Sequence, residues 1–170
     1  MKILEEINKS REYLDYIEEH VLNVEMAWTE IKTKCSDMRF MWDDFYYFSI
    51  QDEIDHHDLS KMSEQEFVQY RKAFYPTESE KIGDEYDITP AWDHHKAHNP
   101  HHWENWTTLK PGKHPNSWEV HCVCMICDWM AMGYKFGDTA KAYYEKNKDK
   151  IDIPEAMVPF MYEIFDRIER

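Results

Sequence analysis

Glycine is scarce in this chain, with four in 170 residues, whereas aromatic residues make up 15%. So few glycines argue against a barrel or sandwich with many tight turns, and the aromatic content favours a helical domain with an aromatic-rich core. No run of about 18 or more apolar residues is present, so we expect no membrane partner. The N-terminal segment is charged throughout and lacks the apolar centre of a signal peptide, so we expect a cytoplasmic protein.

Basic residues are also few, with 20 Lys and Arg against 34 Asp and Glu and a net charge of −14. An extended nucleic-acid surface would need the opposite sign, so we exclude that class of partner. Carboxylates that hold divalent cations would account for part of the negative charge. Three of the four cysteines lie in HCVCMICDW, at offsets that do not gather their thiols on one helix face. We interpret them as reduced, buried packing residues, with a zinc role as the alternative.

Apolar residues near the N-terminus recur at helical spacing, which predicts one long amphipathic helix with a buried stripe. The stripe comprises Ile3, Ile7, Leu14, Ile17, Val21, Val24, Trp28 and Ile31, and His20 lies on it. Ser36-Asp37 predicts a break and cap before an aromatic helix over 38–50, and Ser63 with Glu66 predicts a capping box for a helix over 64–75.

Further helices are expected over about 90–98, 117–133, 139–148 and 154–170, with Pro159 bending the last one, and loops over 77–88 and 107–116. No strand pattern is present. The sequence therefore predicts a single all-α domain over 1–170, a bundle of about six to eight helices.

The histidines are concentrated in three places: His56-His57, His94-His95 with His98, and His101-His102. Imidazole is the commonest side-chain ligand of transition metals, and carboxylate completes the set for harder ions. Asp58 follows His57 directly, and on a helix the two would point about 100° apart, so both reach one ion only if the helix faces a cavity.

Two further candidates lie in apolar surroundings. His20 belongs to the buried stripe, and Asp128 lies within the apolar run MICDWMAM. A buried, unpaired carboxylate costs several kcal/mol, so a cation or strong donors are expected near Asp128. Taken singly, His20 could be a satisfied core histidine, Asp128 could pair with an arginine, and the doublets could be helix surface. Their joint order along successive helices favours a metal site.

This order resembles the HD-domain superfamily of metal-dependent phosphohydrolases, which are all-helical. HDLSK is similar to the HD-x-x-K form of the motif, found in a two-metal phosphodiesterase branch. The whole chain is more closely similar to an uncharacterised family of small bacterial and phage HD-like proteins. The shared pieces are DHHDLSK, EF-x-x-Y-R, AWDHHKAHNPHHW and CDWMAM, over roughly residues 15 to 150. The glycine-tyrosine-proline element of the cyclic-dinucleotide phosphodiesterases is absent, which argues against that substrate class.

The resemblance implies a first ion held by His20, His57, Asp58 and Asp128. A second ion would be held by His95 and His102, or by their neighbours His94 and His101, with Asp58 as the bridge. Sequence alone does not show which histidine of each adjacent pair is the metal ligand. The implied cofactor is one or two divalent ions (Mn, Fe, Co, Mg, Ni or Zn).

Such ions supply the chemistry, because a bound divalent metal lowers the pKa of its water from about 16 toward roughly 7. Asp58 and Lys61 are the catalytic candidates. Lys61 would share a helix flank with Asp58 if the helix continued through Ser60, and its ammonium would then stabilise phosphoryl charge. The alternative for Lys61 is a salt bridge with a nearby carboxylate. Candidate substrate contacts are Arg71, Tyr70, Lys96 and Lys135, with Trp103, Trp106 and Trp129 as aromatic residues that could stack a base.

We therefore expect an HD-type phosphohydrolase whose partner is a small phosphorylated substrate, favouring a nucleotide or deoxynucleotide monophosphate. A homo-oligomer is left open. One rival is a di-iron oxygenase with the same ligand order. The other is a metal-stabilised module that binds a nucleotide or a partner without turnover.

Overall fold

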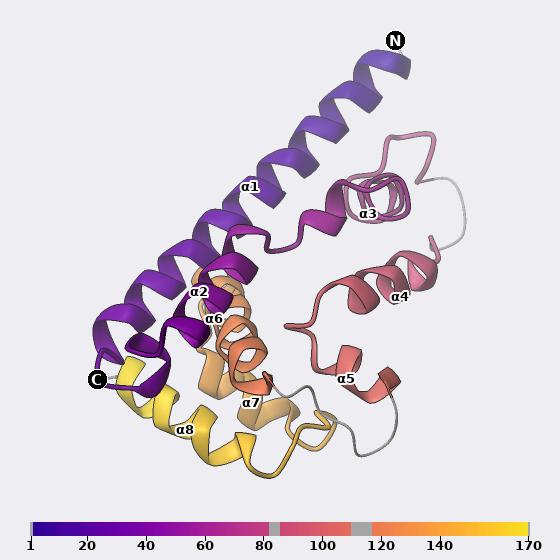
Figure 1. Ribbon diagram of the computed structural model, residues 1–170. Helices are drawn as coiled ribbons and strands as arrows, with labels where there is room; N and C mark the ends of the chain where they lie inside the picture. The colour runs from indigo at the N-terminus through magenta and orange to yellow at the C-terminus, as the bar shows by residue number, and fades with distance from the viewer. Residues whose placement is uncertain (1, 82–85, 110–116, 170) are drawn as a thin grey trace.

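The computed structural model describes residues 2–81, 86–109 and 117–169, and all regular structure in these ranges is helical. The all-α prediction is confirmed: eight α-helices and two short 3₁₀-helices are formed, without a strand in the described residues (Figure 1). Their bounds are α1 (Lys2–Lys34), η1 (Arg39–Met41), α2 (Asp44–Asp55), η2 (Leu59–Met62), α3 (Phe67–Phe74), α4 (Thr89–His98), α5 (Trp103–Leu109), α6 (Trp118–Phe136), α7 (Ala140–Asn147) and α8 (Met157–Ile168).

The centre of the bundle is α6, whose residues from Cys122 to Cys127 and from Trp129 to Ala131 are all buried and apolar, as expected of a helix surrounded by others. It packs against α1, α2, α7 and α8. Its cysteines are buried and free, as is Cys35 in the segment after α1, which confirms their interpretation as packing residues. Because α6 is held on several sides, a polar residue on it has a fixed position.

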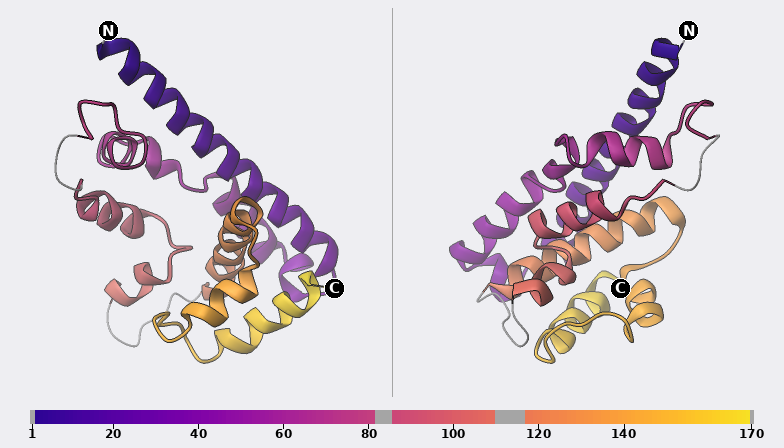
Figure 2. Two further views of the ribbon diagram at one scale, coloured as in Figure 1. Left: turned by 180° about the vertical axis from the view of Figure 1, so that it is seen from behind. Right: turned by 90° about the vertical axis from the view of Figure 1, so that its right-hand side faces the viewer.

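The long helix α1 is buried only along its C-terminal two thirds, where Tyr13, His20, Val24 and Trp28 face the bundle. The predicted stripe is wrong at three positions, because Ile3, Ile7 and Leu14 are exposed. The first turns of α1 extend past the other helices (Figure 2). The segment after α3 reaches them, where the Glu78 amide donates a hydrogen bond to Glu5.

The remaining helices α3, α4 and α5 lie beside the α1–α6 core (Figures 1 and 2). A small apolar cluster of Tyr13, Tyr70 and Ala91 joins α1, α3 and α4. Pro90 lies in the first turn of α4, and Asn99 ends that helix before Pro100, both as predicted. This second group of helices brings the histidines of α4 and the following turn toward α1 and α6.

Several predicted helix ends were wrong. The second helix begins at Asp44 and is capped by Asp43, whose side chain accepts a hydrogen bond from the Phe45 amide, and not by Ser36-Asp37. Pro159 does not bend α8, because it lies in the first turn, where the backbone N–H that proline lacks has no intrahelical partner. The loop predicted over 107–116 falls partly within α5, and its residues 110–116 lie outside the described ranges, as do 82–85.

Among the described helices, none combines the length and apolar composition that crossing a bilayer requires.

Candidate metal centre

The His57-Asp58 pair lies in a turn and not on a helix. Helix α2 ends at Asp55, and η2 begins at Leu59. Between them Asp58 adopts a left-handed backbone conformation with φ of 59°, a region that Asp and Asn visit more readily than other non-glycine residues. The expectation that a helix separates the two side chains by about 100° is therefore wrong. The turn lets both point inward, and both are buried, with 4% and 2% of their surfaces exposed.

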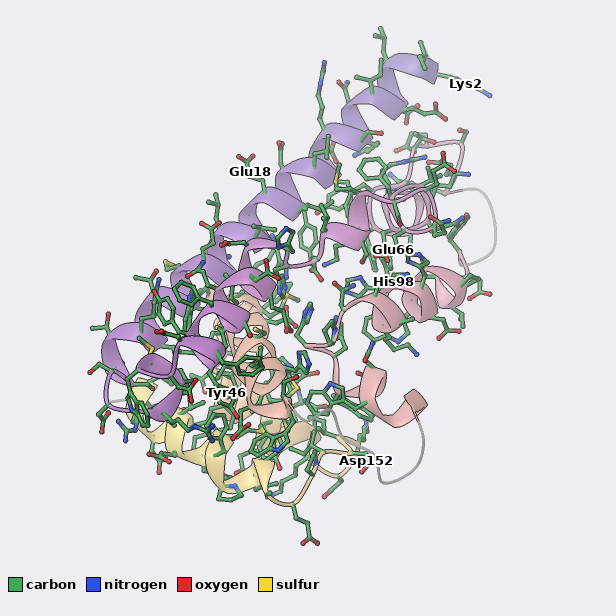
Figure 3. The ribbon with its side chains drawn as sticks, viewed as in Figure 1. Lys2, Glu18, Tyr46, Glu66, His98 and Asp152 are labelled. Atoms are coloured by element: carbon green, nitrogen blue, oxygen red, sulfur yellow. The ribbon has the colours of Figure 1, made fainter. Side chains whose placement is uncertain are left out.

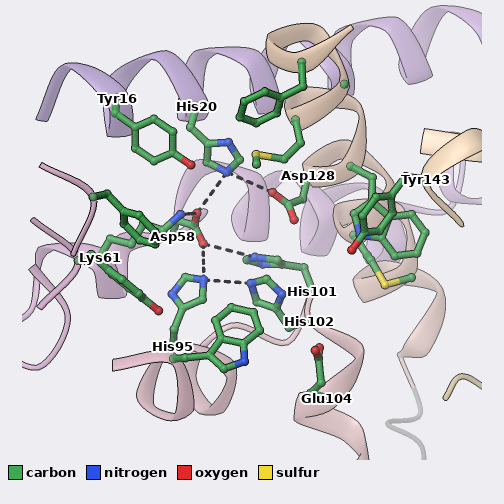
Figure 4. Close-up of a pocket in the computed structure, with 18 of the residues that line it drawn as sticks. Tyr16, His20, Asp58, Lys61, His95, His101, His102, Glu104, Asp128 and Tyr143 are labelled. Carbon is green, nitrogen blue, oxygen red and sulfur yellow. Dashed lines mark hydrogen bonds and ion pairs between the residues drawn. The ribbon is translucent and has the colours of Figure 1, made fainter. Parts of the chain in front are cut away.

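Four other segments contribute side chains to the same place (Figure 4). His20 comes from the buried face of α1, and Asp128 comes from the central helix α6. His95 lies on α4, while His101 and His102 lie in the short turn between α4 and α5. The predicted ligands are thus brought together from positions up to 108 residues apart, the separation of His20 and Asp128.

One group surrounds Oδ2 of Asp58. The Nε2 atoms of His20 and His57 lie 3.2 Å and 3.6 Å from this oxygen and 3.2 Å from each other. Oδ1 of Asp128 lies 3.1 Å from Nε2 of His20 and 3.7 Å from Nε2 of His57. His20, His57 and Asp58 together could hold a metal ion, with Asp128 beside them.

A second group surrounds the other oxygen, Oδ1 of Asp58. The Nε2 atoms of His95 and His101 lie 3.2 Å and 3.4 Å from it. Nε2 of His102 lies 2.9 Å from Nε2 of His95. Asp58, His95, His101 and His102 could hold a metal ion as well. Trp92 packs against the rings of His95 and His102 and so limits their rotation.

Most of these separations, from 3.1 Å to 3.4 Å, match those of ligands around a shared ion. Ligand atoms about 2.1 Å from a metal lie roughly 3.0–3.4 Å from one another in octahedral or tetrahedral geometry. Within the described residues, two of the atoms, Oδ1 of Asp58 and Nε2 of His101, are buried and make no hydrogen bond. Buried polar atoms are rarely left in this state, and an ion between them would satisfy both.

The two carboxylates of the cluster are held in the charged form. Burial alone would raise the pKa of Asp58, but Lys61 and His57 hold it well below its ordinary value. Burial opposes ionisation of Asp128 too, and hydrogen bonds from His20 and His57 keep its pKa well below the ordinary range. Ionised carboxylates are the form that binds cations.

Two of the histidines are held neutral, which is the form that coordinates a metal. Burial and the neighbouring ring of His101 lower the pKa of His102 to about 3. The same two causes lower the pKa of His57. For His20 burial is outweighed by hydrogen bonds with Asp128 and Asp58, which raise its pKa to about 9. An ion bound here would displace that proton.

Glu66 is a part of the site that the sequence reasoning missed. Its carboxylate is fully buried and accepts hydrogen bonds from Nδ1 of His95 at 2.8 Å and Nδ1 of His94 at 2.6 Å (Figure 3 labels Glu66 next to α3). Because a carboxylate only accepts, Nδ1 of His95 donates to Glu66, and Nε2 is the nitrogen that faces Asp58. Burial opposes charge on this ring, but hydrogen bonds with Asp58 and Glu66 raise the pKa of His95, so an ion bound at Nε2 would displace a proton there. The predicted capping box is wrong, since Glu66 makes no side-chain cap bond and Ser63 Oγ has no partner among the described residues.

The structure also shows which histidine of each adjacent pair faces the cluster. His95 faces the cluster, whereas His94 binds Glu66 from outside it. In the last doublet both His101 and His102 face the cluster, because they lie in a turn, and the expectation that one must point away is wrong there. His56 points outward and is 62% exposed.

Lys61 lies beside the cluster. Its Nζ pairs with Oδ2 of Asp58, and the side chain lines a cavity of about 460 Å³ next to the cluster. The 3₁₀-helix η2, and not a continued α-helix, carries it there. Burial disfavours its charge, but Asp58 outweighs this and raises the pKa of Lys61.

The predicted substrate contacts divide into two kinds. Tyr70 lines the cavity, with its hydroxyl buried and without a hydrogen-bond partner in the described ranges. The three basic residues do not line it. Arg71 forms a two-pronged bond with Glu80 at 2.5 Å and 2.8 Å, Lys96 pairs with Asp93, and Lys135 pairs with Glu19. The structure therefore does not bring these cations to the cluster.

Of the tryptophans that were predicted to stack a base, Trp103 and Trp129 line the cavity, and Trp106 is buried in the core.

Comparison with known proteins gives one result. Residues 9–167 match a family described as a family of unknown function (DUF5662). Curated proteins and solved structures gave no match. Because the match covers nearly the whole chain, including every residue of the cluster, this protein belongs to the DUF5662 family.

Proposed function

We propose that this protein is a metal-dependent phosphohydrolase of the HD type, acting on a small phosphate ester such as a nucleotide or deoxynucleotide monophosphate. The observation that carries the proposal is the position of Asp58, whose two oxygens face two separate groups of histidines. A carboxylate placed in this way is suited to bridge two ions. Two ions a few ångström apart are the usual means of stabilising both the attacking and the leaving oxygen of a phosphate ester.

The ligand chemistry narrows the choice of metal. Five imidazole nitrogens and two carboxylates face the cluster, from His20, His57, His95, His101, His102, Asp58 and Asp128. Mg²⁺ prefers oxygen ligands and water, whereas imidazole suits Mn, Fe, Co, Ni and Zn. We expect the native ion to come from this second set. When bound, such an ion lowers the pKa of water and neutralises phosphoryl charge.

The protein's own contribution comes chiefly from Lys61. Its ammonium is charged, nearly buried and lies at the wall of the cavity next to Asp58. A phosphoryl group above the cluster would meet this ammonium as negative charge builds up on its oxygens. Fixed charges in a water-poor site stabilise such charge strongly, because no solvent has to reorganise.

The test is phosphate release by the purified chain from a panel of nucleoside monophosphates and simple phosphate esters, with Mn²⁺, Co²⁺ or Mg²⁺. Asp58→Asn is the matched inactive variant, since asparagine also tolerates the left-handed backbone and the change removes only the charge. His56→Asn, at the exposed neighbouring position, is the control that should retain metal and activity.

The same purified protein also distinguishes the proposed hydrolase from the two alternative functions, a di-iron oxygenase and a binding module without turnover. A protein that holds iron, consumes oxygen and releases no phosphate would contradict the proposal in favour of a di-iron oxygenase. A protein that holds metal and binds nucleotides but turns over no ester in the panel would contradict it in favour of a binding module. Elemental analysis and the visible spectrum identify the ion in each case.

A further inference from the structure

Two buried tyrosine hydroxyls near the metal centre make no hydrogen bond within the described residues. They belong to Tyr13 on α1 and Tyr70 on α3, which are 1% and 5% exposed and lie in the same small apolar cluster. A buried hydroxyl without a partner is costly, and most such groups in proteins have one. Two of them in one cluster have a common explanation if their partner is a bound ligand.

Both tyrosines line the cavity that also contains the candidate ligands. The ring of Tyr70 meets that of His95 edge-on, with their centres 6.1 Å apart. Tyr13 stacks on Tyr16, which stacks in turn on His20, with 6.3 Å between centres at each step. The two phenols therefore approach the metal centre from different helices, one through a ligand of each histidine group.

The two hydroxyls are hydrogen-bond donors at neutral pH. Burial raises the pKa of both, and the charges of Asp58 and Glu66 raise it further. A protonated phenol can donate, whereas the oxygens of a phosphoryl group only accept. The hydroxyls are also shielded from water, where a hydrogen bond to a charged group is stronger than in solvent.

A phosphoryl group at this centre would need donors beyond those of the lysine. Across the part of the chain that the structure describes, Lys61 is the only lysine or arginine in the lining of the cavity. Its ammonium already pairs with Asp58. Two neutral donors would add hydrogen bonds to the phosphoryl oxygens without adding a further charge to the site.

We propose that the hydroxyls of Tyr13 and Tyr70 donate hydrogen bonds to the phosphoryl oxygens of the substrate, with a small shift of either ring toward the bound anion. The inference rests on the proposed function for the place of the phosphate. It can nevertheless be tested by binding alone, without turnover.

The test is calorimetric binding of methylphosphonate, whose carbon–phosphorus bond is not hydrolysed, to the Mn²⁺-loaded protein. Tyr13→Phe and Tyr70→Phe each remove one hydroxyl and keep the ring. We expect each change to weaken methylphosphonate binding about 10- to 100-fold, as is typical of a hydrogen bond to a charged group. Elemental analysis should show that both variants retain Mn²⁺. Tyr144→Phe is the matched control, since Tyr144 is 5% exposed but does not line the cavity, and its affinity should be unchanged.

Thermal unfolding without phosphonate distinguishes a binding role from a structural one. If the hydroxyls have no partner in the free protein, both phenylalanine variants should melt at the same temperature as the unmodified protein or higher. A structural role would give the reverse result, with a lower melting temperature and unchanged methylphosphonate affinity.

Unchanged affinity in both phenylalanine variants would overturn the inference, as would absence of methylphosphonate binding by the unmodified protein. The outcome for the proposed function is separate. Hydroxyl-dependent binding in a protein that hydrolyses no phosphate ester would contradict the proposed function alone, and hydrolysis with unchanged affinity in the variants would contradict this inference alone.

Discussion

His95 donates a hydrogen bond of 2.8 Å from Nδ1 to the fully buried carboxylate of Glu66, and its other nitrogen faces Asp58 at 3.2 Å. The glutamate therefore fixes both the tautomer and the ring plane of a candidate metal ligand. Such outer carboxylates typically raise metal affinity by about 10- to 100-fold.

Glu66→Gln should thus lower metal affinity by roughly one to two orders of magnitude, because the amide offers one acceptor where two histidines now donate. Metal titration followed by elemental analysis measures this, and circular dichroism checks the helices. Glu80→Gln is the control, since that glutamate binds Arg71 and not a candidate ligand. Unchanged metal affinity in Glu66→Gln would show that Glu66 only stabilises the fold.

The two histidines of the 94–95 doublet should behave differently. His95→Ala removes an atom that faces Asp58, so we expect loss of metal from the second group. His94→Ala removes only a hydrogen bond to Glu66 and should retain the metal with a modest loss of affinity. Elemental analysis of the two purified variants decides between them. Equal metal loss in both would contradict the assignment of His95 as the ligand.

Asp128→Asn keeps the shape of the side chain but removes its charge next to His20 and His57. We expect phosphate release to fall by orders of magnitude. The rise in melting temperature on adding Mn²⁺ should also become smaller, since ligand stabilisation depends on the binding affinity. Thermal unfolding with and without Mn²⁺ measures it. An identical rise in the variant would mean that Asp128 has a structural role.

Lys61→Met should retain the metal, since a charged lysine is not a ligand. If the ammonium meets charge that develops in the transition state, kcat should fall about 100- to 1,000-fold with little change in KM. Steady-state kinetics on the metal-loaded variant test this. A kcat near that of the unmodified protein would remove Lys61 from the mechanism and leave only its salt bridge with Asp58.

The Arg71–Glu80 pair makes a stability prediction that is independent of the metal. Hydrogen bonds from Arg71 lower the pKa of Glu80 to about 2, below the ordinary value of 4.5. The stability from this pair is therefore fully present above pH 4.5 and is lost as the pH falls toward 2. Denaturant unfolding of the unmodified protein and of Glu80→Gln should show a difference at neutral pH that shrinks in this window. A difference that stays constant with pH would contradict the pairing.

Local patterns in the sequence determined the helical class, the helix expected over about 117–133 and the end of the 90–98 helix at Asn99-Pro100. These follow from spacing, proline geometry and hydrophobicity, which act over a few residues. The identity of most candidate ligands followed as well, because histidine and aspartate at apolar positions need a partner.

Only the tertiary structure decided how the ligands meet. The left-handed turn at Asp58 directs its two oxygens toward different histidine groups, and no helical periodicity contains that information. Glu66 matched a local capping pattern, but packing of α3 against α4 instead gave its carboxylate the two histidine donors. Arg71 likewise has a partner nine residues away, which keeps it from the cavity. Pairings of this kind depend on which elements pack together, so the sequence supplied the residues of the centre and the fold assigned their partners.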